Sequence, residues 1–153
     1  MAPKTMSIEI DAESAASPQM TIRKVAVIGS GVMGAGIAAH CANAGCDVLL
    51  LDIVPKDADD RSVISRDAIE QMPKSNPEML MHKSNAERIT PGNIEDDLSK
   101  LKEVDWVIEV VIENLDIKRS LYDSLVEHLG HRTILSSNTS TLPRSELAHG
   151  MPH

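Results

Sequence analysis

Aromatic side chains are nearly missing from this sequence of 153 residues, which has one Trp, one Tyr and no Phe. Without a series of rings, the chain offers no surface on which the bases of single-stranded nucleic acid would stack. The core must therefore be built from aliphatic side chains. The hydrophobic fraction of 42% is ordinary for a soluble globular protein, and the length suits one domain.

Positive charge is also scarce, because 15 Lys and Arg residues face 23 Asp and Glu residues and the net charge is −8. Such a chain is poorly suited to binding nucleic acid through the phosphate backbone, and we expect no nucleic-acid partner. A local anion site built from backbone N–H groups remains open, because it needs no net positive charge.

Long apolar runs and an apolar leader are missing as well. The apolar stretches are far shorter than a membrane span, and no apolar stretch of a secretory signal follows residues 1–4. The two cysteines, Cys41 and Cys46, lie five apart, which suits neither a metal pair nor a disulfide. We therefore predict no metal, no membrane contact and a reducing, cytoplasmic location.

The order of elements predicts an α/β protein. Residues 1–20 lack a sustained period and are predicted to be a flexible tail, whereas residues 21–153 form one domain. Strands are expected at 24–28, 47–52, 88–90, 105–111 and 133–135, and helices at 32–44, 63–72, 78–84, 115–129 and 144–149. Their alternation predicts a Rossmann-like doubly wound fold: a mostly parallel sheet between two helical layers (α/β/α), incomplete at the C-terminus.

Two local patterns refine these elements. Pro91-Gly92 is expected to end the strand at 88–90, because proline lacks a backbone N–H for the sheet. In the helix at 115–129, apolar residues recur every four positions and predict its buried face. These residues are Ile117, Leu121, Leu125 and Leu129.

The first strand runs directly into the glycine pattern Gly29-x-Gly31-x-x-Gly34. Gly29 permits the tight turn, Gly31 lets the backbone approach a pyrophosphate, and Gly34 allows the helix to pack closely on the sheet. Val32 and Met33 open the helix, whose N–H groups and positive dipole end then point at the phosphates. The pattern predicts a dinucleotide site; a glycine turn without a ligand is the alternative.

An acid, Asp52, closes the second strand eighteen residues after Gly34. At that position a carboxylate accepts hydrogen bonds from the adenosine ribose hydroxyls and repels a 2′-phosphate, so NAD is favoured over NADP. The nearby cations Lys56 and Arg61 weaken this preference slightly. The alternative for Asp52 is a solvated carboxylate at a strand end.

A second group of polar residues follows the later strands. Glu109 and Glu113 flank the end of the strand at 105–111, and residues 136–141 follow the next strand with five hydroxyl side chains. Because ligands bind outside the carboxyl ends of the strands in an open α/β sheet, these loops and the glycine loop should line one crevice.

Three motifs together resemble the NAD-binding domain of the 3-hydroxyacyl-CoA dehydrogenases, the enzymes of fatty-acid β-oxidation. They are VAVIGSGVMGAGIA at 25–38, EVVIENLDIK at 109–118 and SNTS at 137–140. The first motif is shared with several dehydrogenase families, whereas the other two are more particular to this one. The resemblance covers residues 22–153.

The resemblance implies roles for individual residues. Glu113 and Lys118 would contact the cofactor on its nicotinamide side, Ser140 would hydrogen-bond the substrate's 3-oxygen, and Asn138 would help build that pocket. Taken alone, the residues allow other interpretations. Glu113 could be an acid favoured at a helix start, Lys118 a solvated helix residue, and Ser140 or Thr141 a helix cap.

The complete enzymes of the family oxidise a (3S)-hydroxyacyl-CoA to the 3-ketoacyl-CoA with NAD⁺ and form dimers. Their general base is a histidine in a His-Phe-x-Asn-Pro segment, which this sequence does not contain. Its six histidines lie in other contexts, and most are expected to face solvent. We expect a fragment that binds cofactor without turnover.

Two further inferences concern what the resemblance leaves open. Residues 62–73, where the family contacts CoA, match poorly, so no CoA-binding residue is assigned. Two other functions remain open: another NAD-dependent hydroxyacid or sugar-nucleotide dehydrogenase, and a non-catalytic nucleotide-binding module.

Overall fold

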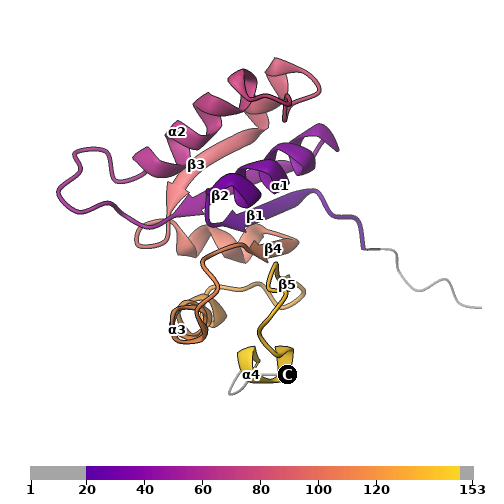
Figure 1. The fold of residues 1–153 in the computed structure, drawn as a ribbon. Helices are drawn as coiled ribbons and strands as arrows, with labels where there is room; N and C mark the ends of the chain where they lie inside the picture. Colours follow the sequence, from indigo (N-terminus) through magenta and orange to yellow (C-terminus); the bar gives the residue numbers. More distant parts are fainter. Residues whose placement is uncertain (1–19, 149–153) are drawn as a thin grey trace, which may run out of the picture.

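The computed structural model describes residues 20–148, so nearly all of the predicted tail lies outside the described residues. Five strands form one parallel sheet in the order β3-β2-β1-β4-β5 (Figure 1). The strands are β1 (Lys24–Ile28), β2 (Asp47–Asp52), β3 (Ile89–Asn93), β4 (Trp106–Glu109) and β5 (Ile134–Ser137). This sheet confirms the predicted Rossmann-like architecture.

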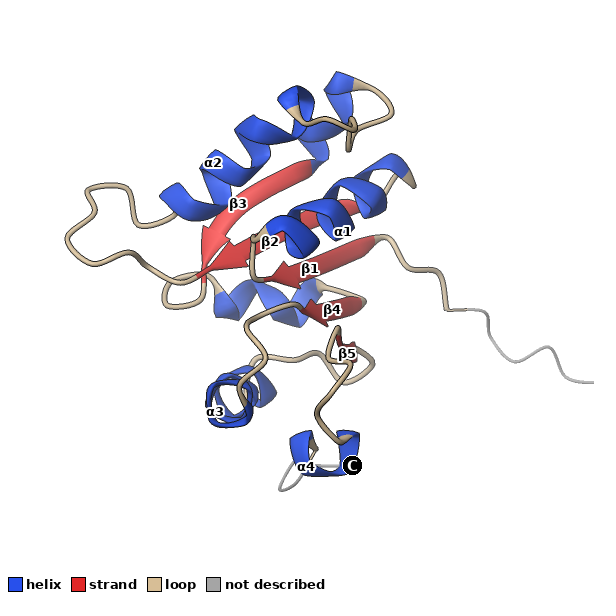
Figure 2. Ribbon diagram, in the orientation of Figure 1, coloured by secondary structure: helices blue, strands red, loops and turns tan. Residues whose placement is uncertain are grey.

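Helices connect the strands. The α-helices are α1 (Val32–Asn43), α2 (Val63–Gln71), α3 (Leu115–Val126) and α4 (Arg144–Leu147), and the 3₁₀-helices are η1 (Met72–Lys74), η2 (Lys83–Arg88) and η3 (Leu98–Glu103). Figure 2 shows α1 and α2 over the same face of the sheet. Within residues 20–148, no helix is both long enough and apolar enough to span a membrane.

The sheet is buried on both faces, as expected for parallel strands. Along β1, Val25 and Val27 pack with α1 and the α2–η1 segment, whereas Ala26 and Ile28 pack with η3 and α3. This alternation follows from the two-residue period of a strand and produces the predicted three layers.

The carboxyl ends of the strands meet at one edge. In the sheet register Ile28 pairs with both Leu51 and Glu109, and Glu109 pairs with Ser137. From β1 the chain first adds β2 and β3 on one side of the sheet and then β4 and β5 on the other. The strand order therefore reverses between β1 and β4, and an open α/β sheet forms its ligand crevice at such a point. The glycine loop leaves β1 at this point.

The middle of the chain differs from the sequence prediction. Strand β3 includes Pro91 and Gly92, which were expected to end it. Because β3 lies at the edge of the sheet, one side of its backbone has no strand partner among residues 20–148, and a proline is tolerated there.

The predicted helix at 78–84 does not form; η2 begins only at Lys83. Asn43 at the end of α1 explains the difference, because its amide donates to the Met79 carbonyl and accepts from the Met81 N–H at 2.9 Å each. These tertiary hydrogen bonds hold the backbone in an irregular conformation that local helix propensity does not favour.

Candidate functional site

The glycine loop leaves open space in front of the helix that it begins. Gly29 adopts a φ of 102°, and a Cβ there would lie 2.6 Å from the Val110 carbonyl oxygen. Gly31 is the N-cap of α1, no side chain caps the helix, and a Cβ on Gly31 would meet no atom within 4 Å. The N–H groups at the start of α1, where Val32 and Met33 are exposed, therefore face room for an anion.

Asp52 is tied to the glycine loop rather than simply solvated. Its Oδ2 accepts hydrogen bonds from the backbone N–H and the hydroxyl of Ser30, both at 2.6 Å, and its Oδ1 accepts from the Ile53 N–H at 2.7 Å. The carboxylate is half-buried, and its remaining lone pairs are available to a ligand. The anchoring role of Ser30 was not predicted from the sequence.

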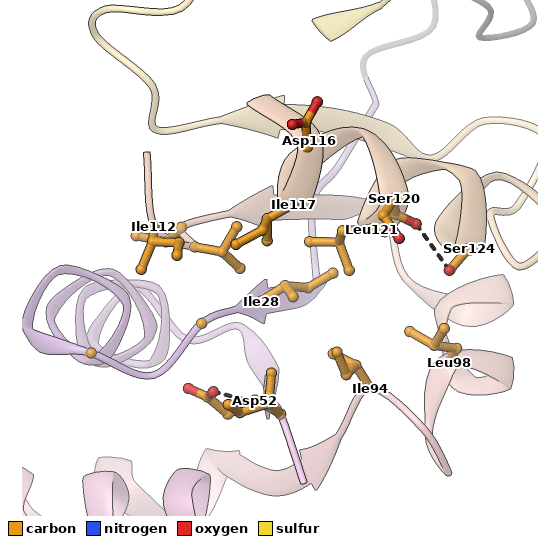
Figure 3. A pocket seen from close by; sticks show the side chains of 15 residues that line it. Ile28, Asp52, Ile94, Leu98, Ile112, Asp116, Ile117, Ser120, Leu121 and Ser124 are labelled. Carbon is orange, nitrogen blue, oxygen red and sulfur yellow. Dashed lines mark hydrogen bonds between the residues drawn. The ribbon is translucent and has the colours of Figure 1, made fainter. Parts of the chain in front are cut away.

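A cavity of about 710 Å³ lies beside Asp52 (Figure 3). Aliphatic side chains line it from two sides, with Ile28 and Ile94 facing Ile112 and Ile117. Ile112 is 66% exposed and Ile117 is 44% exposed, so Ile117 lines this cavity instead of belonging fully to the buried face of α3. Exposed aliphatic residues around a concave site are typical of a surface for a flat apolar group such as a base.

A second cavity, of about 520 Å³, lies on the α1 face of the sheet. Met33 and His40 line it from α1, and Asn138 lines it from the loop after β5. Trp106 also lines it, and the indole N–H donates to the Ser136 hydroxyl at 2.9 Å. The glycine loop and the start of α1 thus have one cavity on each side.

At the end of β4, Glu109 is fully buried together with Lys118, which is 1% exposed. The Lys118 Nζ lies 2.7 Å from the Glu109 Oε1 and 3.5 Å from the Glu113 Oε2, and it donates to the Val111 carbonyl at 3.3 Å. The interpretation of Lys118 as a solvated helix residue is therefore wrong. Burial of a lysine requires such a partner, because an unpaired ammonium is strongly disfavoured away from water.

Glu109 accepts three further hydrogen bonds. They come from the Tyr122 hydroxyl at 2.8 Å, the Ser137 hydroxyl at 2.6 Å and the Val111 N–H at 2.8 Å. Burial raises the pKa of Tyr122 to about 12, so the phenol is a hydrogen-bond donor at neutral pH. The sequence held a signal for this cluster: an acid within an apolar strand, and a Lys and a Tyr four residues apart on the following helix.

Glu113 joins the loop after β4 to the loop after β5. It accepts hydrogen bonds from the Thr139 hydroxyl and from the hydroxyl and N–H of Thr141, the latter two at 2.7 and 3.2 Å. The Thr139 and Thr141 hydroxyls lower the pKa of Glu113 to about 2. Helix α4 is capped by Pro143 without a side-chain hydrogen bond, so neither Ser140 nor Thr141 serves as its cap.

The two residues predicted for the substrate side are exposed. Asn138 and Ser140 lie in the loop after β5, and the Asn138 N–H donates to the Glu109 carbonyl at 2.8 Å. Among the histidines, His40, His82 and His131 are exposed as expected, whereas His128 is half-buried. His149 and His153 lie outside the described residues.

We expect the Glu113 carboxylate to hold the two loops together above pH 4.5 and to lose this effect as the pH falls towards 2. The sign follows because the pKa is lower in the folded chain than the ordinary value. Thermal unfolding of the chain and of Glu113→Gln should show a lower melting temperature for the variant at neutral pH, and the difference should vanish at acid pH. A difference that stays constant across this range would contradict the prediction.

Residues 24–153 match the family described as 3-hydroxyacyl-CoA dehydrogenase, NAD binding domain. The chain belongs to this family. The family and the cofactor NAD predicted from the sequence are thus confirmed.

Individual relatives agree with this assignment. The protein of Bacillus subtilis named probable 3-hydroxyacyl-CoA dehydrogenase is 49% identical over 143 residues, covering 84% of this chain and 18% of its own length. A protein of the same name from Deinococcus radiodurans is 49% identical over 124 residues, covering 81% of this chain and 36% of its own length.

Among solved structures, the 3-hydroxybutyryl-CoA dehydrogenase of Escherichia coli superimposes with a TM-score of 0.71 at 30% identity. The match covers 87% of this chain and 28% of that protein. This dehydrogenase domain therefore corresponds to a minor part of the length of the relatives it matches.

Proposed function

We propose that this chain holds NAD(H) for a 3-hydroxyacyl-CoA dehydrogenase, with the pyrophosphate over Gly31, the adenosine beside Asp52 and the nicotinamide half over the ends of β4 and β5. The observation that carries the proposal is the open space at Gly31, which lies at an uncapped helix N-terminus between two cavities. The site thus offers an anion position between two cavities, and a dinucleotide has a matching arrangement: a pyrophosphate with two negative charges between two nucleosides.

The side chains supply different parts of this binding. The aliphatic cavity takes the adenine, and Asp52 accepts hydrogen bonds from its ribose. Glu113, in the loop after β4, and Lys118, in α3, form an ion pair and are proposed to orient the nicotinamide half. The bound cofactor supplies the hydride acceptor.

On the substrate side, Ser140 is proposed to hydrogen-bond the 3-oxygen of a (3S)-hydroxyacyl-CoA, with Asn138 beside it. Support comes from their exposure in the loop after β5 and from the place of Asn138 in the second cavity. The names of relatives, among them a fatty acid oxidation complex subunit, support an acyl-CoA substrate. A reducing, cytoplasmic location fits the two free, half-buried thiols, and the family resemblance implies a dimer for the complete enzyme.

The chain alone is expected to bind NADH without oxidising or reducing acyl-CoA, because the family's His-Phe-x-Asn-Pro base is not in its sequence. Calorimetric titration with NADH measures binding, and loss of NADH absorbance with acetoacetyl-CoA measures turnover. Failure to bind NADH would overturn the proposed cofactor site. Turnover by the pure chain would instead show that one of its own residues acts as the base.

Asp52→Asn is expected to weaken NADH binding about tenfold and to reduce the discrimination against NADPH. The amide removes the negative charge that opposes a 2′-phosphate. Arg61 does not compensate for it, because its guanidinium is paired with Glu95 and Asp96 at 2.7 Å each. The measurement is the ratio of the NADH and NADPH dissociation constants.

The control for this experiment is Asp59→Asn, which removes an equal charge from an exposed position in the following loop. Its NADH-to-NADPH ratio should equal that of the unmodified chain. If Asp52→Asn leaves the ratio unchanged as well, Asp52 does not contact the ribose.

A further inference from the structure

One buried carboxylate connects both loops of the proposed nicotinamide side. Glu109 has no exposed surface, and its two oxygens accept four hydrogen bonds, from Lys118, Tyr122, Ser137 and the Val111 N–H. Two of these donors come from α3, one from the loop before it and one from the end of β5. The carboxylate is therefore the common point of three segments that are separate in the sequence.

The connection extends to the residues that would face the ligands. Lys118 lies between Glu109 and Glu113, and Glu113 in turn holds the hydroxyls of Thr139 and Thr141 on either side of Ser140. The Asn138 N–H is bonded to the Glu109 carbonyl. The Glu109 carboxylate thus reaches Glu113 through Lys118 and reaches the Thr139 N–H through the Ser137 hydroxyl, whereas its link to Asn138 is made by the backbone carbonyl.

Core stability alone does not account for this arrangement. Burying a carboxylate and an ammonium removes two charges from water, and apolar residues of similar volume often stabilise a core as well or better. A polar cluster in which every donor and acceptor is paired fixes the orientation of each side chain through its hydrogen bonds. Apolar packing does not impose such directions. Its place at the carboxyl edge of β4, beside the glycine loop, is where such precision matters to a ligand.

We propose that Glu109 is a positioning residue that sets the segment 113–118, which runs into α3, and the loop at 138–140 in one arrangement for the nicotinamide ring of the cofactor. It touches neither ligand itself. The inference rests on the proposed function, because it presupposes that the dinucleotide lies across the glycine loop.

The test compares NADH with ADP-ribose, which shares the adenosine, pyrophosphate and second ribose but lacks the nicotinamide ring. Glu109→Gln should bind NADH about tenfold more weakly than the unmodified chain while binding ADP-ribose with similar affinity. A general loss of stability would weaken the binding of both ligands equally. A change in the ratio of the two dissociation constants therefore reports how the nicotinamide is positioned. Glu103→Gln, at an exposed carboxylate paired with Lys24, is the control and should leave the ratio unchanged.

Two milder variants cover the case in which Glu109→Gln does not fold. Tyr122→Phe and Ser137→Ala each remove one hydroxyl donor to Glu109, and each should lower the NADH-to-ADP-ribose preference in the same direction by a smaller factor. The inference would be overturned if every folded variant bound NADH and ADP-ribose more weakly by the same factor, or if none changed either dissociation constant.

The experiment also separates this inference from the proposed function. If the unmodified chain binds neither ligand, the proposed cofactor site is wrong. If it binds both with the same affinity, the cofactor site stands, but the loops held by Glu109 do not contact the nicotinamide and the positioning role is overturned.

Discussion

Gly31→Val is expected to weaken NADH binding at least about 100-fold while the chain remains folded. The Cβ that the substitution adds would meet no protein atom within 4 Å, so we expect the fold to accept it. In the proposed function, that same space is where the pyrophosphate approaches the N–H groups of α1. Titration with NADH and circular dichroism measure the two parts of the prediction.

The appropriate comparison is Gly31→Ala. Both substitutions remove glycine from the N-cap of α1, at about 1 kcal/mol of stability, so this effect is shared. Binding should weaken progressively from alanine to valine, because the larger side chain fills more of the approach. Equal affinity of the valine variant and the unmodified chain would remove Gly31 from the phosphate site, and unfolding would make it a structural glycine.

Gly34→Ala, unlike Gly31→Val, is expected to act on folding, lowering the free energy of unfolding by about 3 kcal/mol or more. A Cβ on Gly34 would lie 1.7 Å from the Gly29 carbonyl oxygen, which is backbone and cannot move aside as a side chain would. Either α1 must move away from β1 or the glycine loop must change shape. Thermal unfolding should show a melting temperature lower by roughly 10 °C.

Gly36→Ala is the matched control on the same helix. Its Cβ would meet no atom within 4 Å, and alanine in a helix interior is favoured over glycine by about 0.5–1 kcal/mol. The control should therefore melt at a slightly higher temperature than the unmodified chain. A Gly34→Ala variant as stable as Gly36→Ala would show that the close contact of helix and loop is relieved at little cost.

The parts of the fold governed by local pattern were predictable. Strands β1 and β2 have the predicted bounds, and α1 begins at the predicted residue, because glycines and apolar runs mark their ends. Strand β4 is shorter than predicted, ending at Glu109, where the carboxylate turns towards α3. The apolar run continues through Val111. The Val110 N–H still donates to the Ile28 carbonyl at 2.8 Å, whereas the Val111 N–H donates to the Glu109 carboxylate instead.

The parts governed by tertiary contacts were not predictable in the same way. The side chain of Asn43 forms hydrogen bonds with the backbone of Met79 and Met81, which prevent the helix predicted at 78–84. No local pattern in the sequence indicates this pairing. From the sequence, Lys118 is expected on the exposed face of its helix. Its burial is explained only by the position of Glu109 in the folded chain. The family resemblance suggested a role for Lys118 without indicating that it is buried.

Trp106 gives the chain a built-in optical probe. It is the only Trp in the sequence, and it lines the cavity that adjoins Met33 and Asn138, away from the cavity that holds Asp52. On the proposed placement of the cofactor, its indole emission should respond to what occupies the nicotinamide side, whereas the aliphatic cavity contains no fluorophore of its own. If NADH binds as proposed, energy transfer from this indole to the nicotinamide would report on that half of the site without any label.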